Sequence, residues 1–279
     1  MQNVTVITGG AGGMGLATAQ VVGRDDSVVL ADVRQDRLDA AVTELAGRGV
    51  TATGLHCDVT DRAAVDELFE RATGRGVLRA VVHTAGVSPS MGDAEYVLRT
   101  NTLGTLYVNE AFHAVAGEGA AIVNVASMGA YLIPEDFVPT AQFALALHDE
   151  AAFLAALRTA CEIVPEDLRS GIAYAVSKAF VKWYSSAAAE RFNTRSQRIV
   201  SVSPGSTDTE MGRLEEQAGA GAMVADAAVP RWGTAQEMAD LLAFCVSERA
   251  GYLTGTDILN DGGVVASMRE RARVAAQQG

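Results

Sequence analysis

The stretch "VTVITGGAGGMGLATAQVV", residues 4–22, decides the fold, because it joins a short apolar run to a helical segment through a turn rich in glycine. The run at 4–7 predicts a strand, and the helix is expected to begin at Gly13. Glycines let a backbone turn tightly and approach a pyrophosphate, and a helix N-terminus adds unpaired N–H donors. The stretch therefore predicts the first unit of a dinucleotide-binding fold; an ordinary flexible loop is the alternative for the turn.

The same alternation of short apolar runs and longer helical segments continues along the chain. We predict further strands at 28–32, 51–59, 79–86, 121–127, 198–204 and 256–261. Helices are predicted from about 35 and at 93–115, 172–194 and 234–248. Strands separated by crossover helices indicate a parallel sheet covered on both faces. The fold class is α/β, a doubly wound parallel sheet (Rossmann fold), and we take residues 1–279 as a single domain.

Two segments interrupt this alternation. The first, about 131–170, is far longer than the connection that the fold needs, and its composition predicts a helical insertion. Its large apolar side chains either wall an apolar substrate pocket or pack the extra helix; they are Phe137, Phe143, Leu147, Phe153 and Leu157. The second segment, about 206–232, combines methionines with several glycines and alanines, which indicates either a mobile substrate lid or a plain surface loop with one helix.

Charge and cysteine content narrow the class of partner. The 22 basic and 34 acidic residues give a net charge of -12, which disfavours nucleic acid and anionic membranes and favours a small molecule. Three scattered cysteines without metal-ligand spacing indicate a reducing cytoplasm and no metal site. No apolar run is long enough to span a bilayer. His56 and His83 lie at predicted strand ends, where a structural role is favoured.

The stretch "GIAYAVSKAF", residues 171–180, carries the candidate chemistry. Tyr174 and Lys178 are four positions apart, so they share one face of a helix. A phenol loses its proton near pH 10, and nearby positive charge from Lys178 and an oxidised nicotinamide would favour phenolate at lower pH. Ser127, at the carboxyl end of a strand, would hydrogen-bond the reacting oxygen.

The choice of dinucleotide is predicted at the end of the second strand. Asp32 lies 17 positions after Gly15, where an acidic residue would bind both ribose hydroxyls of the adenosine half. A carboxylate there would repel a 2′-phosphate, so we expect NAD rather than NADP; a solvated loop residue is the alternative. Arg34, two positions on, leaves open whether NADP(H) is also used.

Taken together, these motifs resemble the classical short-chain dehydrogenase/reductase family over about residues 3–263. The turn "TGGAGGMG" is similar to the family's TGxxxGxG form, and "CDV", "AG" at 85–86, "RTNTLG", "YAVSK", "SPGSTDT" and "NDGG" are similar to its other patterns. The insertion and the "DGGVVASMRER" tail resemble a bacterial hydroxysteroid dehydrogenase/carbonyl reductase subgroup. Two departures stand out: Thr84 in "HTAG" replaces an asparagine of the family's usual turn, and Val200 stands where asparagine is common.

The resemblance implies roles for individual residues. Tyr174 would be the general acid/base, Lys178 would lower its pKa and hold the nicotinamide ribose, Ser127 would position the carbonyl, and Asn101 would order a water relay. The implied cofactor-binding residues are Gly9, Gly12, Gly13, Met14, Gly15, Asp32, Val33, Asp58, Val59, Ala85, Gly86, Tyr174, Lys178, Pro204, Gly205, Thr207 and Thr209. Family members commonly pair, so a homo-oligomer, dimer or tetramer, is expected.

The sequence thus predicts an NAD(H)-dependent oxidoreductase that interconverts a secondary alcohol and a ketone on an apolar, alicyclic or steroid-like substrate. A 3-oxoacyl-carrier-protein reductase is the nearest alternative, but the acidic insertion would not favour an acidic carrier. A non-catalytic dinucleotide-binding redox sensor is the alternative from another class. The exact substrate, its stereochemistry, the physiological direction and the oligomeric order stay open.

Overall fold

The core of the molecule is one sheet of seven strands, as a computed structural model describes it for residues 2–217 and 221–278. The strand order is β3-β2-β1-β4-β5-β6-β9, and every neighbouring pair is parallel. The strands are β1 (Asn3–Thr8), β2 (Ser27–Asp32), β3 (Ala52–His56), β4 (Val77–His83), β5 (Ala121–Val125), β6 (Arg198–Pro204) and β9 (Asp257–Asn260). The predicted doubly wound parallel sheet is confirmed, with its order reversing between β1 and β4.

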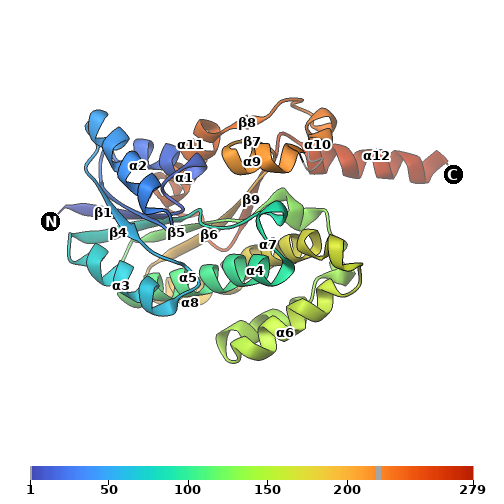
Figure 1. Ribbon diagram of the computed structural model, residues 1–279, viewed down its shortest axis with the longest axis horizontal. Helices are drawn as coiled ribbons and strands as arrows, with labels where there is room; N and C mark the ends of the chain where they lie inside the picture. The colour runs from blue at the N-terminus through green and yellow to red at the C-terminus, as the bar shows by residue number, and fades with distance from the viewer. Residues whose placement is uncertain (1, 218–220, 279) are drawn as a thin grey trace.

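Helices cover both faces of this sheet (Figure 1). One face carries α1 (Gly13–Val22), α2 (Gln35–Gly47) and α11 (Ala235–Val246), whose apolar side chains form one buried cluster with the strands. The other face carries α3 (Arg62–Thr73), α5 (Gly104–Val115) and α7 (Arg169–Ala187), which contribute to a second cluster. Strands that are covered twice need apolar residues on both faces, which explains their continuous apolar runs.

Some predicted helices differ from those in the structure. The segment predicted as one helix at 93–115 is α4 (Ala94–Leu98), a π-helical turn η2 (Arg99–Leu103) and α5. The helix predicted at 172–194 starts earlier as α7 and continues as α8 (Ala189–Asn193). Helix α3 and the C-terminal helix α12 (Val264–Gln278) were not among the predicted elements. The π turn widens the helix by one residue and so changes the direction of the side chains that it carries.

The insertion forms two helical pieces instead of one. A 3₁₀ segment η5 (Thr140–Leu147) is followed by α6 (Glu150–Cys161), and the Asp149 side chain accepts the Ala152 N–H at 2.9 Å to cap α6. Short 3₁₀ turns η3 (Met128–Tyr131), η4 (Glu135–Phe137) and η6 (Glu166–Leu168) connect these pieces to β5 and α7. The break comes where "HDE" offers a capping carboxylate in the middle of an apolar pattern.

Most large apolar side chains of the insertion pack against α7. Phe143 and Phe153 are fully buried, with ring centroids 5.4 and 4.9 Å from that of Phe180, and Leu157 is buried beside them. Packing, not a pocket, is therefore the role of these three side chains. Phe137 and Leu147 instead remain 49% and 43% exposed.

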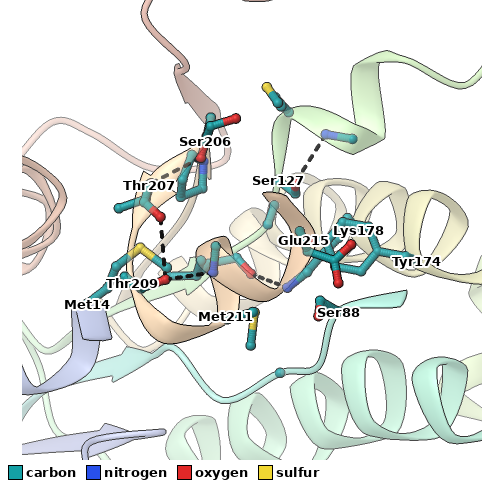
Figure 2. A pocket seen from close by; sticks show the side chains of 18 of the residues that line it. Met14, Ser88, Ser127, Tyr174, Lys178, Ser206, Thr207, Thr209, Met211 and Glu215 are labelled. Atoms are coloured by element: carbon teal, nitrogen blue, oxygen red, sulfur yellow. Dashed lines mark hydrogen bonds between the residues drawn. The ribbon is translucent and has the colours of Figure 1, made fainter. Parts of the chain in front are cut away.

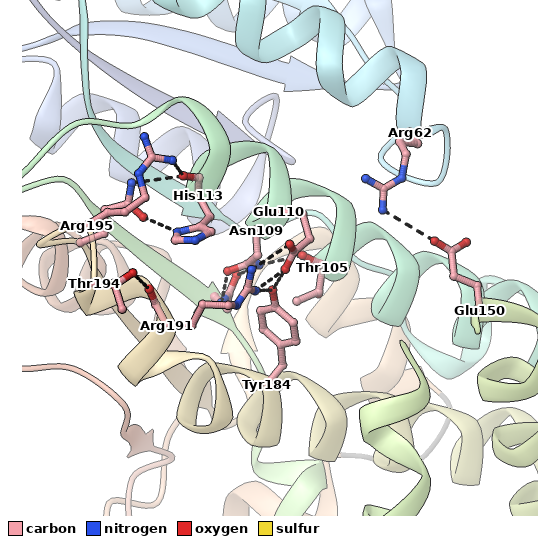
Figure 3. Close-up of polar contacts among 12 residues, drawn as sticks. Arg62, Thr105, Asn109, Glu110, His113, Glu150, Tyr184, Arg191, Thr194 and Arg195 are labelled. Carbon is pink, nitrogen blue, oxygen red and sulfur yellow. Dashed lines mark hydrogen bonds and ion pairs between the residues drawn. The ribbon is translucent and has the colours of Figure 1, made fainter. Parts of the chain in front are cut away.

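Polar contacts attach the start of α6 to the rest of the molecule (Figure 3). Arg62 of α3 lies 3.7 Å from Glu150, and the Tyr107 hydroxyl of α5 donates to the same carboxylate at 2.6 Å. Farther along α5, Glu110 binds Arg191 and the Tyr184 hydroxyl. Exposed ion pairs add little stability, so the aromatic packing holds the insertion and these contacts orient it.

The predicted lid segment lies above the carboxyl ends of the strands. It contains β7 (Thr207–Asp208), α9 (Glu210–Glu215) and α10 (Ala222–Asp226), and β7 pairs with β8 (Gly233–Thr234) just beyond it. Residues 218–220 of this segment lie outside the described residues. Helix α10 packs against α12, which extends away from the sheet (Figure 1).

Candidate active site

A cavity of about 270 Å³ opens at the carboxyl ends of β4, β5 and β6, beneath the lid segment (Figure 2). Such a crevice is where open α/β sheets hold their ligands. Nine of the predicted site residues line it: Met14, Gly86, Ser127, Tyr174, Lys178, Pro204, Gly205, Thr207 and Thr209. Residues from separate parts of the sequence are thus gathered at one edge of the sheet.

Helix α7 places Lys178 beneath the cavity. Its ammonium donates to the Val125 carbonyl at 2.8 Å and lies 5.8 Å from the centroid of the Tyr174 ring. The side chain is nearly enclosed, and this burial lowers the pKa of Lys178 to about 8. Lys178 therefore keeps most of its charge near neutrality while lying close enough to the phenol to favour its ionised form.

Tyr174 and Ser127 meet at Gly129. A Cβ at Gly129 would lie 3.3 Å from Cε1 of Tyr174 and 3.4 Å from Oγ of Ser127, and Ser127 Oγ accepts the Gly129 N–H at 3.1 Å. Burial raises the pKa of Tyr174, the nearby Ser127 hydroxyl opposes this rise, and the negative charge of Glu215 adds to it. The phenol therefore needs further positive charge at the site before it can act as a base near neutrality.

Asn101 lies behind this pair, in the π turn η2. Its Nδ2 donates to the Val87 carbonyl at 3.0 Å and to Ser177 Oγ at 3.1 Å, and its Oδ1 accepts the Val87 N–H at 2.9 Å. A Cβ at Gly86 would lie 3.0 Å from Asn101 Oδ1 and 3.4 Å from Lys178 Nζ. Asn101 thus fixes the loop after β4 beside Lys178, and only a glycine leaves room between them.

The glycine-rich turn has the shape that a dinucleotide requires. Gly9 and Gly13 have φ values of +64° and +51°, and a Cβ at Gly15 would lie 2.4 Å from the Gly9 carbonyl oxygen. Gly12 precedes α1 without a side-chain cap, so the first-turn N–H groups are left for an anion. A Cβ at Gly13 would touch Thr209 at 3.4 Å, so Thr209 faces this turn. These residues fit a bound dinucleotide.

At the end of β2, carboxylates surround the position expected for the adenosine ribose. Asp32 accepts the Arg34 N–H at 3.1 Å, while the Arg34 guanidinium binds the Asp36 carboxylate at 2.9 and 3.1 Å. Arg37 is bound to Glu210 at 2.7 Å. Both arginines that could attract a 2′-phosphate are therefore already paired with acidic side chains.

The remaining predicted cofactor residues lie on the same sheet edge but do not line the cavity. Val33, Asp58, Val59 and Ala85 directly follow or lie just beyond β2, β3 and β4. Asp58 accepts both the N–H and the hydroxyl of Thr60 at 2.8 Å, which shapes the turn before α3.

Thr84 and His83 hold the end of β4 against β1. The Thr84 hydroxyl donates to the Thr8 carbonyl at 2.7 Å. Thr84 therefore makes a side-chain hydrogen bond at the position where the resemblance led us to expect an asparagine. His83 contacts the Thr8 and Thr105 hydroxyls at 2.7 and 3.1 Å. Burial, with Lys178 adding a smaller effect, lowers the pKa of His83 to about 3, so the ring stays neutral. This histidine is structural, as predicted.

A second cavity, of about 460 Å³, adjoins the first and is built largely by the insertion. The two share Gly129, Leu132 and Tyr174. We call the second cavity the annex; its other lining residues are Ile133, Pro134, Phe137, Ile163, Val164, Gly171, Ile172 and Ala175. Phe137 is thus the one insertion side chain singled out from the sequence that does line a cavity next to Tyr174.

Several residues of the first cavity were not predicted. Ser88, Leu132, Glu215 and Trp232 line it from the loop after β4, the segment after η3 and the lid segment. No sequence spacing connects them, so only the fold could identify them.

In the described ranges, no three or more histidine, cysteine, aspartate or glutamate side chains gather as a metal site. Across the same residues, no helix has both the length and the apolar character for crossing a membrane.

Comparisons with known proteins agree with this geometry. Residues 3–138 match the family described as "short chain dehydrogenase", and residues 159–265 match one described as "Enoyl-(Acyl carrier protein) reductase". The chain is 32% identical over 270 residues to a short-chain dehydrogenase/reductase of Alternaria brassicicola, covering 95% of this chain and 97% of that protein.

A further relative and a solved structure extend the comparison. A 3beta-hydroxysteroid dehydrogenase of Eggerthella lenta is 26% identical, covering 92% of this chain and 93% of that protein. A short chain dehydrogenase of Burkholderia cenocepacia, solved in complex with NADP, is 25% identical with a TM-score of 0.73, covering 93% of this chain and 96% of that one.

Proposed function

The chain belongs to the short-chain dehydrogenase/reductase family, and from that premise we propose that it is an NAD(H)-dependent oxidoreductase that interconverts a secondary alcohol and a ketone on an apolar, alicyclic or steroid-like substrate. The observation that carries the proposal is the arrangement of Ser127, Tyr174 and Lys178 around one cavity. The substrate class is supported by the apolar annex and by the relative named as a hydroxysteroid dehydrogenase.

The proposed mechanism assigns one task to each side chain. The bound dinucleotide would supply the hydride acceptor or donor. Ser127 Oγ binds the reacting oxygen, and Tyr174 takes the hydroxyl proton in oxidation and returns it in reduction. Lys178 contributes the positive charge that the buried phenol needs, since burial alone raises the pKa of Tyr174. Asn101 is a positioning residue, because its amide fixes the loop that borders Lys178.

The preference for NAD rests on the end of β2. Gly9, Gly13 and Gly15 would hold the pyrophosphate at the N-terminus of α1, and Asp32 would bind the adenosine ribose. The pairing of Arg34 with Asp36 supports NAD, because this guanidinium is held by a carboxylate instead of awaiting a phosphate. The NADP complex of the Burkholderia protein describes that protein, and the competing choice is tested below.

We further propose that the chain acts as a single domain in which the insertion at about 131–170 shapes the annex and the lid at about 206–232 covers the substrate. The lid proposal is supported by the six cavity-lining residues from 206–217 and by Met223. A homo-oligomer and a cytoplasmic location stay predictions.

A second candidate is a ketoreductase acting on an acyl chain held by a carrier protein. The description of the family matching 159–265 supports only the carrier-bound acyl chain, because the group it names is an enoyl group and not a ketone. An acidic carrier would meet the exposed Glu135 and Asp136, which lie in the chain between the annex residues Pro134 and Phe137, and this does not favour the alternative. Faster turnover of a carrier-bound 3-oxoacyl chain than of any free ketone would support it. Dinucleotide binding without turnover of any carbonyl compound would instead support the redox sensor.

The test follows nicotinamide absorbance while the protein is incubated with NAD and aliphatic, alicyclic and steroid alcohols. Tyr174→Phe is expected to lower kcat by about 10² to 10⁴-fold, the usual contribution of general acid-base catalysis. Tyr96→Phe, at an exposed tyrosine of α4, is the matched control. Calorimetry should show nearly unchanged NAD binding in Tyr174→Phe. Full activity in Tyr174→Phe would contradict the assignment.

A further inference from the structure

Ser88 and Glu215 are among the polar side chains of the catalytic cavity that the proposed mechanism does not use. Ser88 lies on the loop after β4, and Glu215 ends helix α9 of the lid segment. Both line the cavity that holds Tyr174 and Lys178, and Figure 2 draws both side chains among those that line it. Most of the cavity wall is otherwise apolar, including Val87, Leu132, Met211 and Trp232. Two polar side chains in a mostly apolar wall indicate that the ligand carries a polar group that binds them.

Ser88 is buried without a complete set of hydrogen bonds. The residue is 2% exposed, and its hydroxyl hydrogen finds no acceptor among residues 2–217 and 221–278. An unmet buried donor costs about 1–3 kcal/mol, so native structures rarely keep one without a reason. A ligand oxygen in the cavity would supply the missing acceptor.

Glu215 is held at the same wall by the loop that carries Ser88. Its Oε1 accepts the Ser90 N–H at 3.1 Å, which joins the lid helix to the turn η1 (Pro89–Met91). Its charge also acts on the reacting phenol: after burial, the main cause, Glu215 further raises the pKa of Tyr174. A carboxylate can only accept hydrogen bonds, so its remaining lone pairs favour a ligand that donates.

We propose that Ser88 and Glu215 form a second polar subsite that binds a further hydroxyl group of the substrate, which makes alicyclic diols the preferred substrate class. This proposal rests on the proposed oxidoreductase function and names the substrate of the same cavity. The first hydroxyl lies between Ser127 and Tyr174, the ring contacts the apolar wall, and the second hydroxyl lies between the lid and the loop after β4.

A hydroxyl matches this pair better than other groups do. It donates to Glu215 and accepts from Ser88 at the same time. A ketone or ether oxygen cannot donate to Glu215, and a carboxylate would be repelled by it. An ammonium cannot accept from Ser88, and it would share the cavity with the positive charge of Lys178.

The test compares cyclohexanol with cyclohexane-1,2-, 1,3- and 1,4-diol as substrates with NAD. The best diol should exceed cyclohexanol in kcat/KM by about 10-fold or more in the wild-type protein, the size expected for a hydrogen bond to a charged group. In Glu215→Gln that ratio should fall about 10-fold, and Ser88→Ala should lower it by a smaller factor. Glutamine can still accept the Ser90 N–H, so the lid contact is kept.

Two matched controls separate the subsite from general effects. Glu216, the next residue, pairs with Arg213 at 3.0 Å and does not line the cavity, so Glu216→Gln should keep the wild-type ratio. Ser90 is exposed and contributes only its backbone N–H to Glu215, so Ser90→Ala should keep it too. A wild-type protein without preference for any diol, or a preference that persists in both Glu215→Gln and Ser88→Ala, would overturn the proposal.

Calorimetry distinguishes failure of the subsite from failure of the proposed function. Binding of the same four compounds is measured to Tyr174→Phe loaded with NAD, with and without Glu215→Gln. If a diol binds more tightly than cyclohexanol and Glu215→Gln abolishes this difference, the subsite is supported, whether or not the wild-type protein oxidises any alcohol. If the wild-type protein oxidises none of them, only the proposed oxidoreductase function is contradicted. Equal binding of cyclohexanol and all diols would overturn the subsite.

Discussion

The dinucleotide half and the substrate side of this molecule use different physical means to build their sites. Around β1, α1 and β2, the site is formed mainly by the backbone, through positive-φ glycines and an uncapped helix N-terminus, with an acidic residue at the end of β2. Around the insertion and the lid, the site is formed by side chains that either pack against α7 or line a cavity. Backbone sites are tied to local sequence, whereas side-chain sites depend on contacts between distant segments.

The largest effect is expected inside the insertion, where packing and cavity side chains can be separated. Phe153→Ala should lower the free energy of unfolding by about 3–5 kcal/mol, because it leaves a cavity against Phe180. Phe137→Ala, at a half-exposed position, should change it by about 0.5 kcal/mol or less. Chemical denaturation of both variants measures the difference. Equal losses of unfolding free energy in the two variants would contradict the division of the insertion into packing and cavity side chains.

The dinucleotide half is tested by Asp32→Ala. Loss of a charged acceptor for the ribose hydroxyls should lower the ratio of kcat/KM with NAD to that with NADP by about 10–100-fold. Asp39→Ala, at an exposed carboxylate of α2 that pairs with Gln35, serves as the control. If the ratio stayed unchanged in Asp32→Ala, another residue would set the cofactor preference.

A smaller effect, on KM, is expected when the annex is changed. Phe137→Ala should raise KM about 3- to 10-fold for alcohols that carry an apolar arm, because about 1 kcal/mol of apolar contact is lost, and should affect cyclohexanol less. Leu147→Ala is a matched control, since this residue is similarly exposed but lines a separate hollow beside Arg62 and Glu150. The same rise in KM for Leu147→Ala would show that the annex does not hold the substrate.

The smallest effect concerns pH. Two charged groups bear on Tyr174: Lys178 lies near its ring, and Glu215 raises the pKa of Tyr174. Because alcohol oxidation needs phenolate, Glu215→Gln should lower that pKa and shift the rising limb of the kcat/KM profile to lower pH. Glu216→Gln should leave the profile in place. A shift to higher pH would contradict the charge effect.

Local patterns explain why the sheet and the catalytic residues could be predicted from the sequence. Tyr174 and Lys178 are four positions apart on one helix, and Ser127 follows β5 by two residues, so local spacing brings them to the same edge of the sheet. The π turn that holds Asn101 has no comparable signal, because one extra residue per turn leaves the composition of a helix unchanged.

Longer-range features could not be predicted for the same physical reason. Phe137 and Phe153 have the same chemistry in the sequence, and only the tertiary packing makes one a cavity wall and the other part of the core. Ser88 and Glu215 lie far apart in the sequence, and they line one cavity only because the lid helix contacts the loop after β4. Polar residues that act through such a meeting look like ordinary loop and helix residues in the sequence.

The central claim, hydride transfer from a carbinol carbon at this cavity, is tested most directly with deuterium. The wild-type protein is incubated with NAD and with cyclohexanol or cyclohexane-1,2-diol deuterated at the carbinol carbons, and the cofactor is analysed by mass spectrometry. The account predicts reduced nicotinamide that carries one deuterium per molecule, with none formed by Tyr174→Phe above about 1% of the wild-type rate. Reduced cofactor without deuterium, or bound NAD that is never reduced, would contradict it.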